Sequence, residues 1–196
     1  MRRVSFDDHE PDTLDDGTAR IRLGHELDTE HVAINRYRVP PGSHGTAGLH
    51  THADQEEVFV VCSGTATFET LDGLVTVDEG EAIRFPPGEF QSGRNEGTDP
   101  LVVLAIGAPR DTDDVRVPIS CTDCDHDDLR LELAEGAVSF VCPECNRSRT
   151  ATACPRCGGD DLNVTLEEPG DESPQVIVRC RDCNESFDRP PVTTDW

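Results

Sequence analysis

Three polar residues in the first half of the chain have the types and the spacing of a metal site: His50, His52 and Glu57. Alternate side chains of an extended strand share a face, so His50 and His52 can present two imidazoles to one ion. Glu57 precedes an apolar run at residues 58–61, which predicts a buried strand. Two histidines and a carboxylate form the facial triad that suits non-haem Fe(II), and the same donors accept Mn, Ni, Co or Zn. The sequence therefore predicts a transition-metal site, and the ligands alone do not name the ion.

The turn residues Gly80, Pro86 and Gly88 fix where the side chain of Gln91 points, and that side chain leaves three interpretations open. Its side-chain carbonyl oxygen can coordinate a metal, but the group is neutral and a poorer donor than imidazole for the later first-row metals. It could be a weak fourth ligand, or it could hydrogen-bond a metal-bound water. In the third interpretation the site has lost its catalytic metal and keeps only the pocket.

Eight of the nine cysteines lie in four Cys-x2-Cys knuckles in the second half of the chain. The knuckles are Cys121/Cys124, Cys142/Cys145, Cys154/Cys157 and Cys180/Cys183. Paired in sequence order, they are separated by 17 and 22 residues, and these spacings suit two four-thiolate Zn sites. The rival pairing joins the two middle knuckles and leaves the outer two for each other. We prefer the sequential pairing because only it places a strand, a turn and a strand inside each site.

Closed four-cysteine sites stabilise small modules and offer no open coordination position for catalysis. Modules of about 30 to 40 residues bury little surface, so we expect two structural Zn ions to supply much of their folding energy. Disulfides would need an oxidising compartment, and no apolar signal peptide follows Arg2 and Arg3. A thioredoxin-like redox role would need a βαβ pattern, which is missing. The ninth cysteine, Cys62, ends an apolar strand, and we expect it in the core.

Short apolar segments separated by Gly, Pro and Asp-Gly turns predict an all-β fold. In the first half the expected strands cover residues 32–39, 49–52, 58–62, 66–70, 74–77, 82–85 and 101–106. In the second half we expect hairpins that join 129–133 with 138–141 and 162–166 with 176–178. This pattern indicates a sandwich or barrel followed by two small hairpin modules.

Two segments of the first half resemble the signature motifs of the cupin superfamily. They read His50-x-His52-x4-Glu57-x6-Gly64 and Gly80-x5-Pro86-x-Gly88-x2-Gln91-x3-Asn95. The resemblance covers about residues 29–110 and implies a jelly-roll barrel with an internal ligand pocket and a homodimer formed through the sheets. One position departs from the family, because a cupin usually supplies a third metal-binding histidine where this chain has Gln91. The cysteine hairpins resemble zinc ribbons.

These patterns divide the chain into six expected segments. They are an acidic N-terminal arm at 1–28, a cupin barrel at 29–110, a linker at 111–118, zinc ribbons at 119–150 and 151–189, and a tail at 190–196. Within the arm, residues 20–23 could add an edge strand.

The composition is strongly acidic, with 40 acidic residues, 17 basic residues and a formal net charge of -23. All 17 basic residues are arginine, and the composition resembles that of haloarchaeal proteins, in which molar salt screens self-repulsion. No run of 18 apolar residues is present, so we expect no membrane span and a cytoplasmic protein. Phosphate binding needs a basic patch, and none is evident in the sequence. We therefore expect the ribbons to contact a protein partner or to give structural support rather than to bind nucleic acid.

Two functions agree with these features. The barrel could be a non-haem metal enzyme of dioxygenase, isomerase or decarboxylase type that acts on a small organic acid or a similar metabolite. Alternatively, it could be a non-catalytic small-molecule-binding or regulatory module whose zinc ribbons contact a protein partner. An inward-facing arginine would anchor a carboxylate, and Arg36, Arg38 and Arg84 are the candidates. His44 could serve as an acid or base near the barrel mouth, or it could be a loop residue without such a role.

Overall fold

A computed structural model of the chain describes residues 1–43, 48–134, 136–167, 174–193 and 196. It is almost entirely β, and it divides into two compact units. The first unit contains Met1–Thr46 and His52–Asp113, and the second contains Ala47–Thr51 and Asp114–Trp196. All eight knuckle cysteines belong to the second unit. The expected all-β class, with a barrel domain and two small four-cysteine modules, is confirmed.

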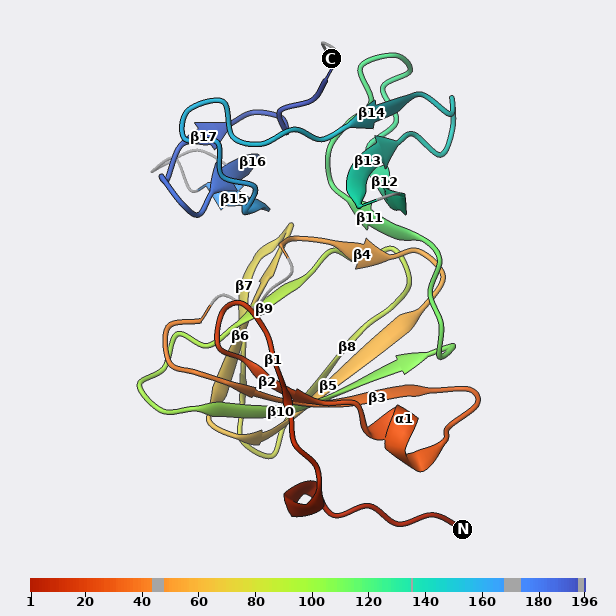
Figure 1. Ribbon diagram of the computed structural model, residues 1–196, viewed down its shortest axis with the longest axis vertical. Helices are drawn as coiled ribbons and strands as arrows, with labels where there is room; N and C mark the ends of the chain where they lie inside the picture. Colours follow the sequence, from red (N-terminus) through yellow and green to blue (C-terminus); the bar gives the residue numbers. More distant parts are fainter. Residues whose placement is uncertain (44–47, 135, 168–173, 194–195) are drawn as a thin grey trace. The chain divides into compact units, whose positions relative to one another are not determined.

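The first unit is built on a six-stranded antiparallel sheet with the order β1-β2-β3-β10-β5-β8 (Figure 1). Its strands are β1 (Asp12–Thr13), β2 (Ala19–Ile21), β3 (Ala33–Val39), β10 (Leu101–Ala108), β5 (Glu56–Ser63) and β8 (Ala82–Phe85). The long central pairings follow from β-branched and aliphatic runs in β3, β5 and β10, which favour extended backbone. Four of these strands, β3, β5, β8 and β10, correspond to the strands expected at 32–39, 58–62, 82–85 and 101–106.

A three-stranded sheet with the order β7-β6-β9 packs against the large sheet. Its strands are β7 (Gly73–Asp78), β6 (Thr65–Thr70) and β9 (Ser92–Arg94). The two sheets share one core cluster, which contains Val39, Val61, Ala66, Phe68, Val77, Phe85 and Leu101. In its centre the Phe59, Phe68 and Phe85 rings lie within 5.0 to 6.0 Å of one another, centroid to centroid. Aromatic contacts of this kind supply the apolar area that holds the two layers together.

Strict alternation along the large sheet decides which side chains face this core. In β10 the buried positions alternate with half-buried ones over its whole length. In β5 the buried residue is Val61, so its neighbour Cys62 points to the other face and is exposed. The expectation that Cys62 packs in the core is therefore wrong, because at this position of the strand the side chain lies on the face of the sheet that points away from the core.

The segment before β3 differs from the expected arm, because it pairs with the barrel. It contains a 3-10 helix, η1 (Phe6–Asp8), then β1 and β2, and a short helix, α1 (Leu23–Leu27). Two apolar residues within this acidic stretch, Ile21 and Leu23, are buried and anchor it. The alternative edge strand at residues 20–23 thus corresponds to β2, which pairs with β3.

The second unit contains the two cysteine modules. One sheet has the order β14-β13-β12-β11-β4, and a second has the order β15-β16-β17. The strands are β4 (Thr51–His52), β11 (Val115–Val117), β12 (Leu129–Ala134), β13 (Ala137–Val141), β14 (Ser148–Thr150), β15 (Leu162–Glu167), β16 (Gln175–Cys180) and β17 (Ser186–Phe187). Both expected hairpins are present as β12–β13 and β15–β16. Part of the expected linker forms β11.

Residues near the C-terminus pair with the first cysteine module. Val192 forms an isolated antiparallel bridge with Ala151, and the Thr193 N–H donates to the Thr150 carbonyl at 3.0 Å. The Trp196 ring lies 6.1 Å from the Phe140 ring, and its indole N–H donates to the Pro190 carbonyl at 2.8 Å. Val192 and Thr193 therefore pair alongside the end of β14.

Candidate metal centre

The two histidines and the glutamate converge on one point. His50 and His52 lie two residues apart in the segment of β4, and Glu57 lies near the start of β5. One ligand atom from each of the three residues lies within 4.8 Å of the others. The side chains of His52 and Glu57 are 14% and 17% exposed, and His52 Nε2 is 3.6 Å from Glu57 Oε1. This spacing is that of donors around a common ion.

Hydrogen bonds at Nδ1 orient both imidazoles. His50 Nδ1 is 2.7 Å from the Gly48 carbonyl oxygen, which can only accept, so Nδ1 carries the proton. His52 Nδ1 is 3.2 Å from Thr112 Oγ1, and the Thr112 hydroxyl donates to Asp54 Oδ1 at 2.5 Å. Since its proton is used there, Thr112 accepts from His52. In both rings Nε2 therefore carries the lone pair, as a metal ligand requires.

The electrostatics of this relay keep each group in the state that metal binding needs. Burial lowers the pKa of His52, and the nearby Asp54 carboxylate only partly opposes it, so the ring is neutral at pH 7. Burial would raise the pKa of Asp54, but hydrogen bonds from Thr112 and from the Asp113 backbone outweigh burial and lower it. The hydrogen bonds from His52 through Thr112 to Asp54 therefore join a neutral imidazole to an ionised carboxylate.

Gln91 lies beside the glutamate. The preceding turn contains Gly88, which has φ +89 and whose N–H donates to the His52 carbonyl at 3.0 Å. Gln91 itself is 3% exposed, and its Nε2 donates to Glu57 Oε2 at 3.0 Å. None of the three interpretations from sequence included this partner. The bond holds one Glu57 oxygen while the other faces His52.

Two residues of the site were not predicted from the sequence: Thr112, and Asp54 as a hydrogen-bond acceptor. Thr112 lies in the segment expected as a linker, 60 residues from His52 and 58 from Asp54. No local spacing signals such a contact. Gln55 supports it, because its buried side chain donates to the Pro109 carbonyl at 2.6 Å and so fixes the chain just before Thr112.

The three arginines expected as carboxylate anchors do not share a face with Glu57. Register pairs Arg84 with Val58 and Arg36 with Leu104, and both partners lie on the outer face of the large sheet. Arg36 lies over the Phe6 ring at 5.1 Å, and Arg84 Nε donates to Glu56 at 2.7 Å. Arg38 has the same strand phase as Arg36 and is exposed. The anchor assignment is therefore wrong for all three, and His44 lies outside the described residues.

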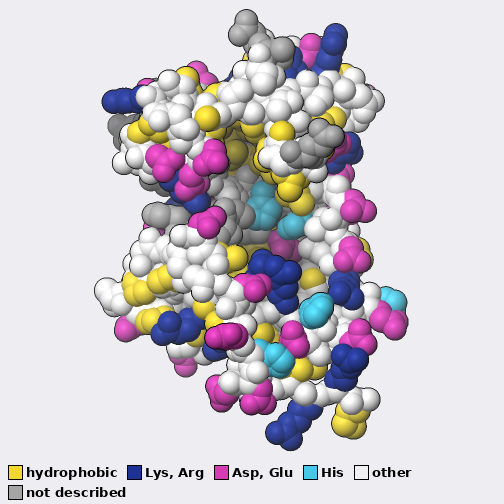
Figure 2. All heavy atoms as spheres, viewed as in Figure 1, with side chains coloured by type: hydrophobic (Ala, Val, Ile, Leu, Met, Phe, Trp, Pro, Cys, Tyr) yellow, Lys and Arg dark blue, Asp and Glu magenta, His cyan; other side chains and the backbone are white. Residues whose placement is uncertain are grey.

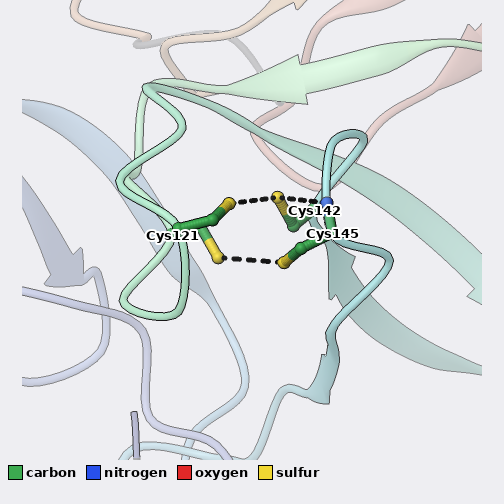
Figure 3. Close-up of side chains that lie close together, drawn as sticks. Cys121, Cys142 and Cys145 are labelled. Atoms are coloured by element: carbon green, nitrogen blue, oxygen red, sulfur yellow. Dashed lines mark hydrogen bonds between the residues drawn. The ribbon is translucent and has the colours of Figure 1, made fainter.

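The eight knuckle cysteines form two clusters in sequence order. Figure 3 shows the first cluster, with Cys121, Cys142 and Cys145 labelled. In the first, Cys121 and Cys145 sulfurs are 3.7 Å apart, and Cys124 and Cys142 sulfurs are 3.5 Å apart. In the second, the corresponding distances are 3.7 Å for Cys154 to Cys183 and 3.6 Å for Cys157 to Cys180. Sulfurs about 2.3 Å from one tetrahedral Zn ion lie about 3.8 Å from each other, so the spacing fits Zn. All nine cysteines are free thiols.

Each knuckle repeats one backbone design. The residue after the second cysteine has positive φ, at 58 to 59° or, for the glycine, 78°. Those residues are Asp125, Asn146, Gly158 and Asn184, the types that tolerate this conformation. In each case its N–H donates to the carbonyl of the first cysteine at 2.8 to 3.0 Å. The turn points backbone N–H groups at sulfur, as in Cys145 N to Cys142 Sγ at 3.5 Å.

At one cysteine of each cluster, Cys142 and Cys154, these donors favour the thiolate form. Burial would raise the pKa of Cys142, but backbone N–H groups of Cys145 and Glu144 outweigh burial and lower it to about 7. Burial opposes the same effect at Cys154, where donors from Cys157 and Arg156 lower the pKa to about 7. Each cluster thus has one sulfur ready to bind a metal near neutral pH, because the thiolate is the ligand.

Figure 2 shows one face of the molecule, on which acidic side chains are scattered with arginines among them. Many of the arginines pair with carboxylates; Arg116, for example, binds Asp114 at 2.6 Å and Asp128 at 3.1 Å. Arg149 binds Asp123 at 2.8 Å.

Within the described ranges, none of the helices has the length and apolarity that a membrane crossing would require.

Comparison with known proteins finds similarity in the first half of the chain. The model of the cupin domain family matches residues 35–107. The oxalate-binding protein of Thermotoga maritima is 27% identical over 95 residues, which cover 46% of this chain and 77% of that protein. A structure assigned as a sugar phosphate isomerase from Acidithiobacillus ferrooxidans is 27% identical, covers 64% of this chain and 76% of its own, and has a TM-score of 0.50. A polyketide cyclase from Streptomyces resistomycificus shares the fold, with 22% identity, 63% and 89% coverage and a TM-score of 0.53.

Proposed function

We propose that residues 35–107, which the cupin domain model matches, bind a divalent transition metal through His50, His52 and Glu57 and act on a small organic acid. The observation that carries the proposal is the convergence of the three donors together with the Nδ1 hydrogen bonds that turn both imidazoles toward it. Gln91 would act through Glu57 rather than as a ligand, because it donates to that carboxylate. The ion would be Fe, Mn, Ni or Zn.

A metal bound there would act as a Lewis acid toward a carboxylate or carbonyl oxygen. The chain's own groups have separate tasks. The Thr112 and Asp54 relay keeps His52 neutral and in one orientation, and the Gln91 amide holds one oxygen of Glu57. Such partners of metal ligands commonly contribute 10- to 100-fold in metal affinity or activity. The reaction type would be dioxygenation, isomerisation or decarboxylation of the bound acid.

Metal analysis of the whole chain tests this proposal. Protein purified in high salt should carry two Zn for the cysteine clusters and one further transition-metal ion. A His50→Ala, His52→Ala double variant should lose the further ion and keep the two Zn. His31→Ala is the control, because its side chain is 92% exposed and lies outside the cluster. An ion that the double variant retains at the wild-type level would refute the site.

A second candidate function is a non-catalytic binding module. The observation that favours it is Gln91, whose amide hydrogen bond to Glu57 stands where cupins usually have a metal-binding imidazole. The relative from Thermotoga maritima is named for binding oxalate rather than for turning it over. Metal-loaded protein incubated with oxalate separates the two functions. Stoichiometric binding with unchanged oxalate favours the module, whereas product formation that His50→Ala abolishes favours the enzyme.

We also propose a role for the cysteine clusters, an adaptation to high salt and a homodimer. The cysteine clusters would hold structural Zn and offer a surface for a protein partner rather than for nucleic acid. The acidic, lysine-free composition would suit a cytoplasm with molar salt. A homodimer through the large sheet is supported by half-buried apolar residues on its outer face, such as Ile34, Val60 and Leu104. Light scattering in high salt tests the dimer, and a monomeric mass would refute it.

A further inference from the structure

An arginine outside the matched cupin segment lies on the same face as the proposed metal centre. Arg20 is in β2, and register places it directly opposite Tyr37 of β3. Directly paired residues of antiparallel strands project to one face. Tyr37 packs against the core cluster, so Arg20 lies on the inner face of the large sheet. Arg36, one residue along from Tyr37, projects to the other face.

Tyr37 connects Arg20 electrostatically with Glu57. Burial raises the pKa of Tyr37, and the Glu57 carboxylate raises it further. The charge of Arg20 and its hydrogen bond to the phenol oppose that rise. The phenol of Tyr37 is therefore a neutral hydrogen-bond donor that interacts with an arginine and with a proposed metal ligand.

The hydrogen-bonding capacity of Arg20 is only partly used. Its Nη2 is 3.3 Å from Asp12 Oδ2, and the same oxygen is 3.2 Å from Arg22 Nε. The Asp12 side chain is 54% exposed, and ion pairs of this kind contribute little. Among the described residues, Arg20 Nε is buried and has no hydrogen-bond partner. A guanidinium binds a carboxylate best through two parallel N–H bonds, and Asp12 supplies one contact of that kind.

We propose that Arg20 and Tyr37 form a carboxylate-binding subsite that fixes a small anionic ligand within the barrel. The carboxylate would accept from the Arg20 fork and from the Tyr37 hydroxyl, taking the place of Asp12 on the guanidinium. The ligand class is a small mono- or dicarboxylate. This assignment rests on the proposed function only for the other end of the ligand, which would reach the metal centre at Glu57.

Titration calorimetry of the full chain in high salt, loaded with Mn(II), tests the subsite. Oxalate is the anionic probe, and oxamide is its neutral counterpart. Arg20→Gln should raise the Kd for oxalate about tenfold or more, because it removes hydrogen bonds to a charged group. Tyr37→Phe should weaken oxalate binding by a smaller factor. Arg36→Gln on the outer face is the matched control and should leave the Kd within about twofold of wild type.

Two further variants separate binding from folding and from the metal. Asp12→Asn should tighten oxalate binding by up to about fivefold, the contribution of one exposed ion pair, and misfolding cannot produce such a gain. Arg20→Gln should retain its Mn(II). Failure of the wild type itself to hold Mn(II) would count against the metal site and not against the subsite. Wild-type oxalate affinity in Arg20→Gln would overturn the subsite. Equal affinity of wild type for oxalate and oxamide, or no oxalate binding by wild type that holds Mn(II), would overturn it too.

Discussion

The hydroxyl of Thr112 gives the sharpest test of how the chain prepares His52 for a metal. Thr112→Val keeps the shape of the side chain and removes the group that accepts from His52 Nδ1 at 3.2 Å. Asp54 still accepts from the Asp113 backbone at 2.9 Å, so the main loss falls on the imidazole. The ring can then adopt the other tautomer, in which Nε2 carries the proton and cannot bind a metal.

Loss of such a partner lowers metal affinity about 10- to 100-fold, or about 1.4 to 2.8 kcal/mol. Competition with a chelator, with Mn(II) as the ion, measures this directly. Thr65→Val is the matched control, since its hydroxyl also donates to an aspartate, Asp78, at 2.8 Å but on the exposed surface. Equal Mn(II) affinity in the two variants would refute the orienting role of Thr112.

Three further predictions concern the rest of the molecule. Chelating the zinc should unfold the cysteine modules and change the fluorescence emission of Trp196, the chain's one tryptophan, because its ring contacts Phe140. Cys121→Ser should weaken zinc binding, whereas Cys62→Ser should not. Unchanged fluorescence on chelation would contradict this prediction. Burial would raise the pKa of Asp16, but hydrogen bonds from Ser43 and Thr18 outweigh burial and lower that pKa. The carboxylate should therefore stabilise the fold above about pH 4, and this stabilisation should be lost as the pH falls through the lowered pKa. Acid titration followed by circular dichroism should show a smaller loss of stability for Asp16→Asn than for wild type, and an identical loss would contradict the prediction. The melting temperature should rise with KCl concentration because salt screens the net charge of -23, and a flat dependence between dilute and molar salt would contradict the proposed salt adaptation.

Features with a local periodic signal could be predicted from the sequence. Alternation along a strand places His50 and His52 together, and Glu57 follows within a few residues. The cysteine clusters follow from the spacing of the knuckles, and residues such as Asn146 mark the turn that each knuckle needs. In these cases the chemistry and the geometry lie in the same short segment.

Features that depend on long-range register could not be predicted. Thr112 meets His52 across 60 residues, and Arg20 meets Tyr37 through a strand that begins in an acidic stretch. Cys62 shows the same limit within a strand, since a shift of one residue changes the face on which a side chain lies. The partner of Gln91 depended on where the turn after β8 placed its amide.

We propose that His50, His52 and Glu57 hold one metal ion. Anomalous diffraction from crystals grown in high salt, with data collected at the Mn, Fe, Ni and Zn edges, would locate that ion. We expect two Zn peaks within the cysteine clusters and a third peak bounded by Nε2 of both histidines and the Glu57 carboxylate. Anomalous peaks at the cysteine clusters alone, with the Gln91 to Glu57 hydrogen bond intact, would contradict it.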